Sequence, residues 1–465
     1  MKFIRPLIIA GKEVLPLVEG GKGISASNGI SSGAWAAAGG IGTFSAAYAD
    51  FYDDKNELVP IVYNTKTRKD RHKELLAYSI EAGISQAKIA YEASMGNGLI
   101  NINVLWGMAE IEKMLHGILE KTKDIVNGIT CGAGMPFRLA EIAAKYKVYY
   151  YPIVSSARTF EILWKRAYNK FAEWLGAVVY EDPWKAGGHN GLSKAENPEN
   201  PENPYDRVRQ LRTTMNKYNL GNIPIIMAGG VWFLREWEDW IDNPELGPII
   251  FQFGTRPLLT QESPIPMKWK KRLLTLKEGD VILNHFSPTG YYSSAVKNNF
   301  LTGLQERSRR QIKYFSTLQG EYTEPISINE RGRIFYLRKE DKDSANLWNK
   351  VGATKAVITP DDTLVFLTPE EFKKLRKDQN DCSGCLKYCK FSNWAENDDI
   401  KVNKIPDIRS YCIQKTLRAI AHGEDVEENL MFAGNRAYLF AQDPFYKNGF
   451  IPTVKQLIER IITGN

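Results

Sequence analysis

The chain has 465 residues, of which 43% are hydrophobic and 25% are charged. These values are typical of a soluble globular protein with a sizeable core, and the length favours one large domain with an appendage. The net charge of +7 comes from 61 basic and 54 acidic residues spread along the whole chain. Because the basic side chains form no block, we expect no nucleic acid partner.

The N-terminal region contains two stretches that superficially resemble targeting or membrane segments. The apolar run within residues 1–10 is short and is stopped by Lys12 and Glu13, so we expect a strand and no signal peptide. Residues 23–49 carry no charge, but their Gly, Ala and Ser content indicates a packed loop and helix, so we expect no membrane span. The five cysteines, an odd number without a signal peptide, favour reduced thiols and a cytoplasmic location.

Eight apolar runs alternate with helix-length segments from about residue 15 to residue 274. The runs are residues 15–19, 39–44, 100–105, 125–131, 148–154, 176–180, 223–227 and 249–253. This alternation implies parallel strands covered on both faces, in either a closed barrel or a doubly wound open sheet. Glycine-rich turns follow several runs, and no dinucleotide fingerprint follows the first, so we predict an α/β fold, a (β/α)8 TIM barrel.

One of these turns carries a candidate catalytic group. The run 176–180 is followed by Ala186-Gly187-Gly188-His189-Asn190-Gly191. The two glycines let the backbone approach a ligand closely, and a histidine changes its protonation near neutral pH. The combination indicates a cofactor site with a base beside it.

The turns after the last two runs are candidates for binding a phosphate. They contain Gly229-Gly230 and Gly254-Thr255. TIM barrels often bind a phosphate between these two loops and the helix that follows. Backbone N–H groups at the glycines and the Thr255 hydroxyl would act as donors.

Taken together in order, these motifs resemble the nitronate monooxygenase family, also called 2-nitropropane dioxygenases. The matching pieces cover roughly the first 275 residues and are Gly20-Gly21, 38–42, 134–136, 186–191, 228–230 and 252–256. A similar "MFAG" segment near residues 430–435 precedes a terminal helix. The resemblance implies an FMN-binding barrel related to the FMN-dependent enoyl-ACP reductases.

The resemblance also implies roles for individual residues. His189 matches the catalytic histidine, acting either as a base on a nitroalkane or as a cation that holds a preformed nitronate. The residues implied to contact FMN are Gly20, Gly21, Lys22, Gly187, Gly188, Ala228, Gly229, Gly230, Gln252, Gly254 and Thr255.

The activity implied is oxidation of alkyl nitronates, or of a related small anionic substrate, with O2. One alternative is an NAD(P)H-dependent FMN reductase of the enoyl-ACP or quinone reductase type, which needs room for nicotinamide. A second alternative, from another class, is a non-catalytic or RNA-associated flavoprotein whose cysteine module recruits a partner.

Two positions depart from the family pattern. Lys22 stands where relatives usually have Met, and Lys185 stands where they usually have Glu. If both side chains point into the site, its potential is more positive than in relatives, which favours an anionic substrate. The alternative is that both ammonium groups extend to solvent.

Residues 276–465 are expected to form a mixed C-terminal extension. Four of its residues, Cys382, Cys385, Cys389 and Cys412, form a cysteine-rich segment that could hold zinc or a [4Fe–4S] cluster. A cluster is favoured slightly because it could pass electrons to a flavin, and scattered reduced thiols are the alternative.

Two helices are predicted in the extension. Thr368 and Glu371 predict a capping box, and an apolar stripe over 451–462 predicts a terminal helix docked on the barrel. A role of that helix in a homodimer is left open.

Overall fold

The computed structural model describes residues 2–327, 333–397 and 405–464. Its centre is a closed barrel of parallel strands, in which each predicted apolar run supplies one strand. In the order in which they are neighbours, the strands are β3 (Leu17–Glu19), β4 (Ile41–Ser45), β7 (Leu99–Leu105), β8 (Gly128–Gly132), β9 (Tyr149–Val154), β10 (Val178–Glu181), β12 (Ile225–Ala228) and β13 (Ile249–Phe253). The predicted TIM barrel is confirmed.

The barrel interior is filled by alternate residues of these strands. Val18, Val179 and Ile250 belong to one buried cluster inside the barrel, and Ile9 and Val14 join it from below. Those last two residues come from a hairpin of β1 (Leu7–Ile9) and β2 (Lys12–Val14), which pairs outside the barrel sheet. The strand expected near the N-terminus therefore exists, and it closes the bottom of the barrel.

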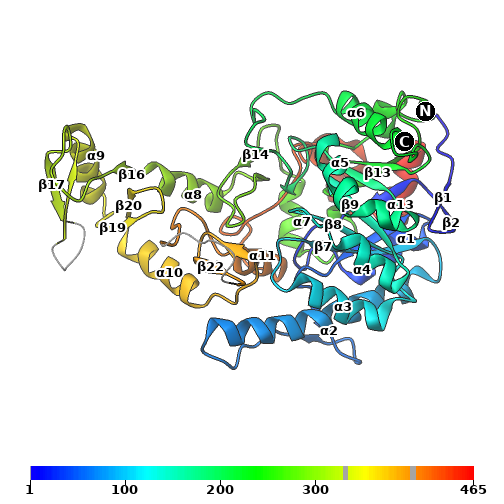
Figure 1. The fold of residues 1–465 in the computed structure, drawn as a ribbon, viewed down its shortest axis with the longest axis horizontal. Coiled ribbons are helices and arrows are strands. Elements are labelled where there is room, and N and C mark those ends of the chain that lie inside the picture. The colour runs from blue at the N-terminus through cyan, green and yellow to red at the C-terminus, as the bar shows by residue number, and fades with distance from the viewer. Residues whose placement is uncertain (1, 328–332, 398–404, 465) are drawn as a thin grey trace.

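Helices surround the barrel (Figure 1). They are α1 (Gly29–Ala37), α2 (Arg68–Ser94), α3 (Ile111–Thr122), α4 (Leu139–Tyr146), α5 (Ala157–Arg166), α6 (Pro204–Asn216), α7 (Met267–Leu273) and α13 (Val454–Thr463), with 3-10 turns at Tyr168–Trp174, Leu234–Trp237, Arg256–Leu259 and Pro444–Gly449. α1 starts at Gly29 because the Asn28 side chain accepts the N–H of Ser31 and caps the helix. The uncharged stretch 23–49 is thus a loop, a short helix and a strand. Among the described residues, no helix combines the length and the apolar character that crossing a membrane requires.

The remaining elements are short strands and helices, most of them after residue 275. They are β5 (Phe51–Tyr52), β6 (Leu58–Val59), β11 (Gly188–His189), β14 (Val281–Asn284), β15 (Ser293–Val296), α8 (Asn299–Arg309), β16 (Gln311–Lys313), β17 (Glu324–Ser327), β18 (Ile334–Leu337), α9 (Lys339–Lys350), β19 (Lys355–Ile358), β20 (Thr363–Leu367), α10 (Pro369–Asn380), β21 (Tyr388–Cys389), β22 (Trp394–Ala395), α11 (Ile413–Ala421) and α12 (Leu439–Gln442). The predicted capping box of Thr368 and Glu371 begins α10. α9 and β17 lie at the end of the molecule farthest from the barrel (Figure 1).

The extension returns to the barrel in two places that matter for the site. β15 pairs antiparallel with β11, so the segment that carries His189 becomes the edge of a small sheet. The terminal helix α13 packs against α1 on the barrel. One buried apolar cluster contains residues of both parts, such as Leu115 of α3 and Leu417 of α11. The division of the chain at residue 275 stays a prediction.

Candidate active site at the mouth of the barrel

Polar side chains line the upper part of the barrel interior. Because side chains alternate along a strand, Glu181 faces inward two residues after Val179, and Gln252 does so two residues after Ile250. Glu181 and Gln252 flank Ala228 in the register of three adjacent strands. These groups lie at the carboxyl ends of the strands, the face on which TIM barrels build ligand sites.

The first predicted glycine pair, Gly20 and Gly21, packs against polar side chains in the upper part of the barrel. A Cβ on Gly20 would lie 2.9 Å from the Gln252 amide nitrogen, and one on Gly21 would lie 2.4 Å from the Asn103 side chain. Glycine at both positions therefore lets two amide side chains lie against the backbone of the first loop. Asn103 was not among the predicted site residues, although a polar residue within an apolar run was a signal for it.

Lys22 is placed against a buried carboxylate. Its Nζ lies 2.5 Å from Glu19 Oε1, and the two side chains are 6% and 0% exposed. Ser31 Oγ donates a second hydrogen bond to the same carboxylate oxygen. The positive charge of Lys22 is thus balanced locally by Glu19, and its side chain does not extend to solvent.

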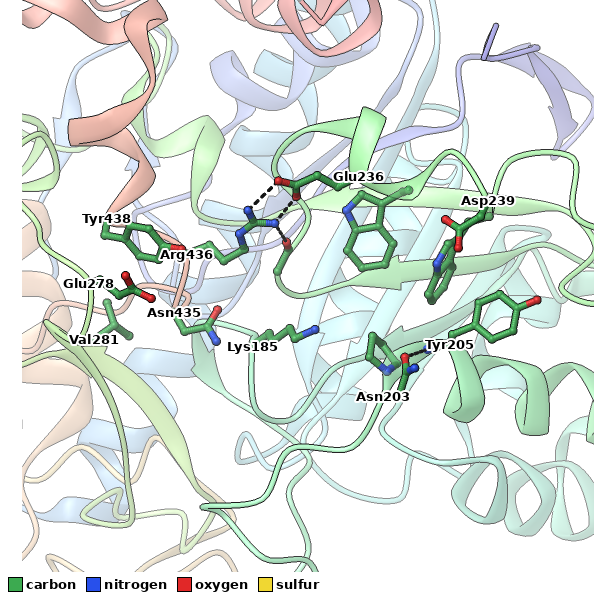
Figure 2. Close-up of a pocket in the computed structure, with 15 residues that line it drawn as sticks. Lys185, Asn203, Tyr205, Glu236, Asp239, Glu278, Val281, Asn435, Arg436 and Tyr438 are labelled. Atoms are coloured by element: carbon green, nitrogen blue, oxygen red, sulfur yellow. Dashed lines mark hydrogen bonds and ion pairs between the residues drawn. The ribbon is translucent and has the colours of Figure 1, made fainter. Parts of the chain in front are cut away.

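Lys185 instead borders an open cavity of about 830 Å³ that reaches the Gly230 turn (Figure 2). Its ammonium lies 3.9 Å from Asp182 Oδ2, a distant ion pair. Arg436 lines the same cavity and is paired with Glu236 through both of its terminal nitrogens (Figure 2). Of the two departures from the family pattern, only Lys185 brings charge to a cavity.

His189 is held by residues of the extension. Its Nε2 lies 2.6 Å from Ser287 Oγ, which in turn lies 2.7 Å from Thr289 Oγ1. The Phe432 ring meets the imidazole edge to face, with 5.5 Å between ring centroids. Burial lowers the pKa of His189 to about 4, so the imidazole is neutral at physiological pH. An uncharged imidazole at this place can accept a proton.

The late glycine turns meet the segment that carries His189. Gly229 and Gly230 have φ of +94° and +78°, a conformation that favours glycine. A Cβ on Gly229 would lie 3.0 Å from the backbone nitrogen of Ala186, so the two loops are in close contact. Gly254 is exposed, and no atom lies within 4 Å of the position its Cβ would take.

The "MFAG" segment completes this face of the barrel. The Gly434 N–H donates to Thr255 Oγ1 at 2.9 Å, and the Asn435 N–H donates to the Lys185 carbonyl at 3.3 Å. A Cβ on Gly187 would lie 2.6 Å from the Ala433 carbonyl carbon. Sequence reasoning noted this segment but did not place it in the site, because its proximity depends on the path of the whole extension.

Arg256, the last residue of the glycine–threonine motif, contacts the loop after β12 and the C-terminal segment. It is buried, forms an ion pair with Asp443 at 3.4 Å and donates to the Trp232 carbonyl at 2.6 Å. Arg256 thus joins the loop after β12 to the residues that precede α13, and so anchors the C-terminal segment on the barrel.

Glu181 is a second residue that sequence reasoning missed. Burial and the neighbouring Asp182 raise the pKa of Glu181 to about 8, so its carboxyl group is protonated at neutral pH. An acidic residue at the inward end of an apolar run was the available signal. A neutral carboxyl at this place can donate a hydrogen bond to a ligand.

Glu181→Gln is expected to stabilise the protein progressively, relative to wild type, as the pH rises from about 5 to 8. In that range the wild-type unfolded state has lost a proton that the folded state retains, so wild-type stability falls with pH through the folded pKa of about 8. Thermal melts of both proteins across the range measure this, with exposed Glu120→Gln as the matched control. A difference in Tm that does not vary with pH would contradict the prediction.

The four cysteines of the extension line one small cavity. Cys382, Cys385 and Cys389 are buried, and Cys412 closes the cavity from the start of α11. Burial raises the pKa of the Cys385 thiol, and the three other cysteines add to the shift. Within residues 2–327, 333–397 and 405–464, no group of three or more His, Cys, Asp or Glu is already arranged to hold a metal ion. The predicted zinc or iron–sulfur centre is therefore not shown by the arrangement of the side chains.

A family model described as nitronate monooxygenase matches residues 11–464. The chain belongs to the nitronate monooxygenase family. Its members are FMN-dependent oxidoreductases acting on small molecules, which confirms the predicted family and enzyme class. No curated protein matches the chain.

Solved structures share the fold of this nitronate monooxygenase family member at low sequence identity. FabK from Thermotoga maritima is 16% identical with a TM-score of 0.51, and the match covers 96% of this chain and 91% of that one. The enoyl reductase domain of MlnA from Bacillus amyloliquefaciens is 13% identical with a TM-score of 0.53, covering 97% and 93%. At these identities the likeness establishes the architecture, and not the substrate.

Proposed function

We propose that the protein oxidises alkyl nitronates, formed in the site or bound preformed, or a related small anionic substrate, with FMN as cofactor and O2 as electron acceptor. The observation that carries this proposal is His189, a neutral imidazole held by Ser287 beside the glycine turns at the barrel mouth. A neutral imidazole next to a flavin suits removal of an acidic proton from carbon.

The late turns fit the phosphate end of FMN. Gly229 and Gly230 adopt positive φ, and the space beside the Gly254 backbone is free of protein atoms. The Thr255 oxygen accepts from Gly434, which leaves its own proton for a phosphate oxygen. Gln252 and the protonated Glu181 offer hydrogen bonds inside the mouth. When bound, FMN supplies the two-electron redox chemistry, while the protein supplies position and charge.

His189 would act through its Nδ1 atom. With Nε2–H donated to Ser287 Oγ, the tautomer leaves the Nδ1 lone pair free to accept a proton from the carbon beside a nitro group. The transfer creates an imidazolium next to a nitronate anion. That opposite charge favours the protonated ring and offsets the burial that lowers the pKa of the free side chain.

The alternative, an NAD(P)H-dependent reductase, is favoured by one observation. The cavity of about 830 Å³ beside Gly230 has a volume suited to a ligand of nucleotide size and contains Lys185 and Arg436. Two solved structures with this fold are FabK and an enoyl reductase domain. Here the cavity would bind the nicotinamide nucleotide, and His189 would act on the acceptor.

Anaerobic titration of the FMN-loaded protein distinguishes the two activities. We expect ethyl nitronate, and nitroethane more slowly, to bleach the flavin absorbance, with O2 restoring it. Bleaching by NADPH or NADH but not by the nitronate would replace the proposal with the reductase. A spectrum unchanged by all of these reagents would contradict both activities and favour a non-catalytic flavoprotein.

Gly254→Ala is expected to weaken FMN binding by about tenfold, which corresponds to ~1.4 kcal/mol, without destabilising the apoprotein. The added methyl group meets no protein atom, so only a ligand on this turn would contact it. Fluorescence titration of apoprotein with FMN and thermal melts of the apoprotein measure the two effects. Unchanged FMN affinity would place the phosphate elsewhere, and Gly303→Ala, also free of contacts, is the control.

A further inference from the structure

Residues 382–396, here called the cysteine segment, bring three thiols to a single cavity. Together with Cys412 at the start of α11, the sulfur-bearing side chains surround an enclosed space of about 10 Å³. The other residues that line it are Asp378, Ser383, Phe391, Ser392 and Ile413. Four of the five cysteines of the chain thus converge from two separate stretches on one point of the fold.

The cysteine segment is buried although it has almost no regular structure. Its only strands are β21 and β22, each of two residues. Side chains contribute to holding it in place: Gln379 Nε2 donates to the Phe391 carbonyl at 2.8 Å, and Ser383 Oγ donates to Gln414 Oε1 at 2.6 Å. A buried loop of this kind forms few backbone hydrogen bonds of its own, so bonds to a shared ion or cluster would stabilise it.

We propose that Cys382, Cys385, Cys389 and Cys412 together bind a thiolate-ligated metal centre, either Zn²⁺ or a [4Fe–4S] cluster. Both centres take four cysteine thiolates from a chain. On binding, each thiol releases its proton to solvent and each sulfur forms one bond to the metal. The four cysteines already line one cavity, and binding would draw their sulfurs together around the shared ion or cluster.

The centre would fix the cysteine segment onto the catalytic face. The Cys385 carbonyl accepts from the Tyr48 hydroxyl and from the Ala109 N–H, and the Lys387 N–H donates to the Gly107 carbonyl at 2.8 Å. These three partners lie in the loops that follow β4 and β7, at the carboxyl ends of the strands. Arg71 of α2 also donates two hydrogen bonds to the Cys382 carbonyl.

The metal content of the anaerobically purified full chain tests the proposal. We expect about one zinc per chain, or about four irons and four acid-labile sulfides with absorbance near 400 nm after FMN removal. Either result supports the four-thiolate centre, and the two results distinguish its occupants. Cys412→Ser and Cys382→Ser should each lower the metal content at least tenfold.

Cys131→Ala is the matched control, because Cys131 is buried in β8 and does not line the cavity. It should retain the full metal content. Since a ligand variant can fail to fold, thiol titration of the wild type provides a second measurement. We expect four protected thiols that become reactive as metal is released to a chelator. A folded wild-type protein without metal, even after reconstitution with zinc or with iron and sulfide, would overturn the proposal.

Discussion

His189→Ala is expected to lower kcat/KM for nitroethane by about 10²–10⁴-fold, the usual contribution of a general base. Removal of the imidazole leaves Ser287 and Phe432 in place but removes the group that accepts the proton. FMN affinity should stay near the wild-type value, because the phosphate turns are formed by other residues. Oxidation of preformed ethyl nitronate should fall much less, since that substrate has already lost its proton.

The pH dependence gives an independent check on the same residue. With a pKa of about 4, His189 stays neutral as the pH falls toward 5. Wild-type kcat/KM for nitroethane should therefore fall only below about pH 5, as the imidazole becomes protonated. His285→Ala is the matched control, because His285 lies in the neighbouring loop, is exposed, bonds the Gly290 carbonyl and packs against the Tyr292 ring. Activity of His189→Ala within twofold of wild type on nitroethane would exclude the histidine as the base.

Gly187→Ala is expected to destabilise the protein by about 1–3 kcal/mol or more, as overpacking does in a buried contact. The new methyl group would lie 2.6 Å from backbone atoms of Ala433 and Gly434. Backbone cannot rotate away as a side chain can, so the "MFAG" segment must move. The hydrogen bond from Gly434 to Thr255 would break with it, and FMN affinity should fall as well.

Urea unfolding and FMN titration measure the two consequences of Gly187→Ala. Gly303→Ala in α8 is the control, because its methyl group meets no atom and alanine favours a helix by about 0.5–1 kcal/mol over glycine. If Gly187→Ala were as stable as wild type and bound FMN equally well, the "MFAG" segment would not be required to complete the site.

The barrel itself could be predicted in detail. Each of the eight apolar runs overlaps one strand, because a parallel strand covered on both faces must be apolar along its length. Two glycine turns could be predicted equally well, because positive φ and close backbone approach both require glycine. They are the turn of Gly187 and Gly188 and the turn of Gly229 and Gly230. The family assignment rested on these same positions and is confirmed.

The two lysines could not be interpreted from the sequence. From the sequence, each ammonium group could either point into the site or extend to solvent. The structure gives the two side chains different surroundings. Lys22 meets the buried carboxylate of Glu19, whereas Lys185 borders the cavity beside Gly230. The direction of a long side chain depends on which partner lies within its reach, and that partner is set by the packing of the loops.

The sequence by itself determined the barrel, its glycine turns and the position of His189 in the chain, because these depend on local periodicity and on backbone conformation. Only the tertiary structure decided that Ser287 and Phe432 enclose His189, that the "MFAG" segment reaches Thr255, and that four cysteines share a cavity. Those contacts join residues about 100 or more positions apart, or thiols on separate turns. Their formation depends on how the extension folds back over the barrel mouth, which no local pattern encodes.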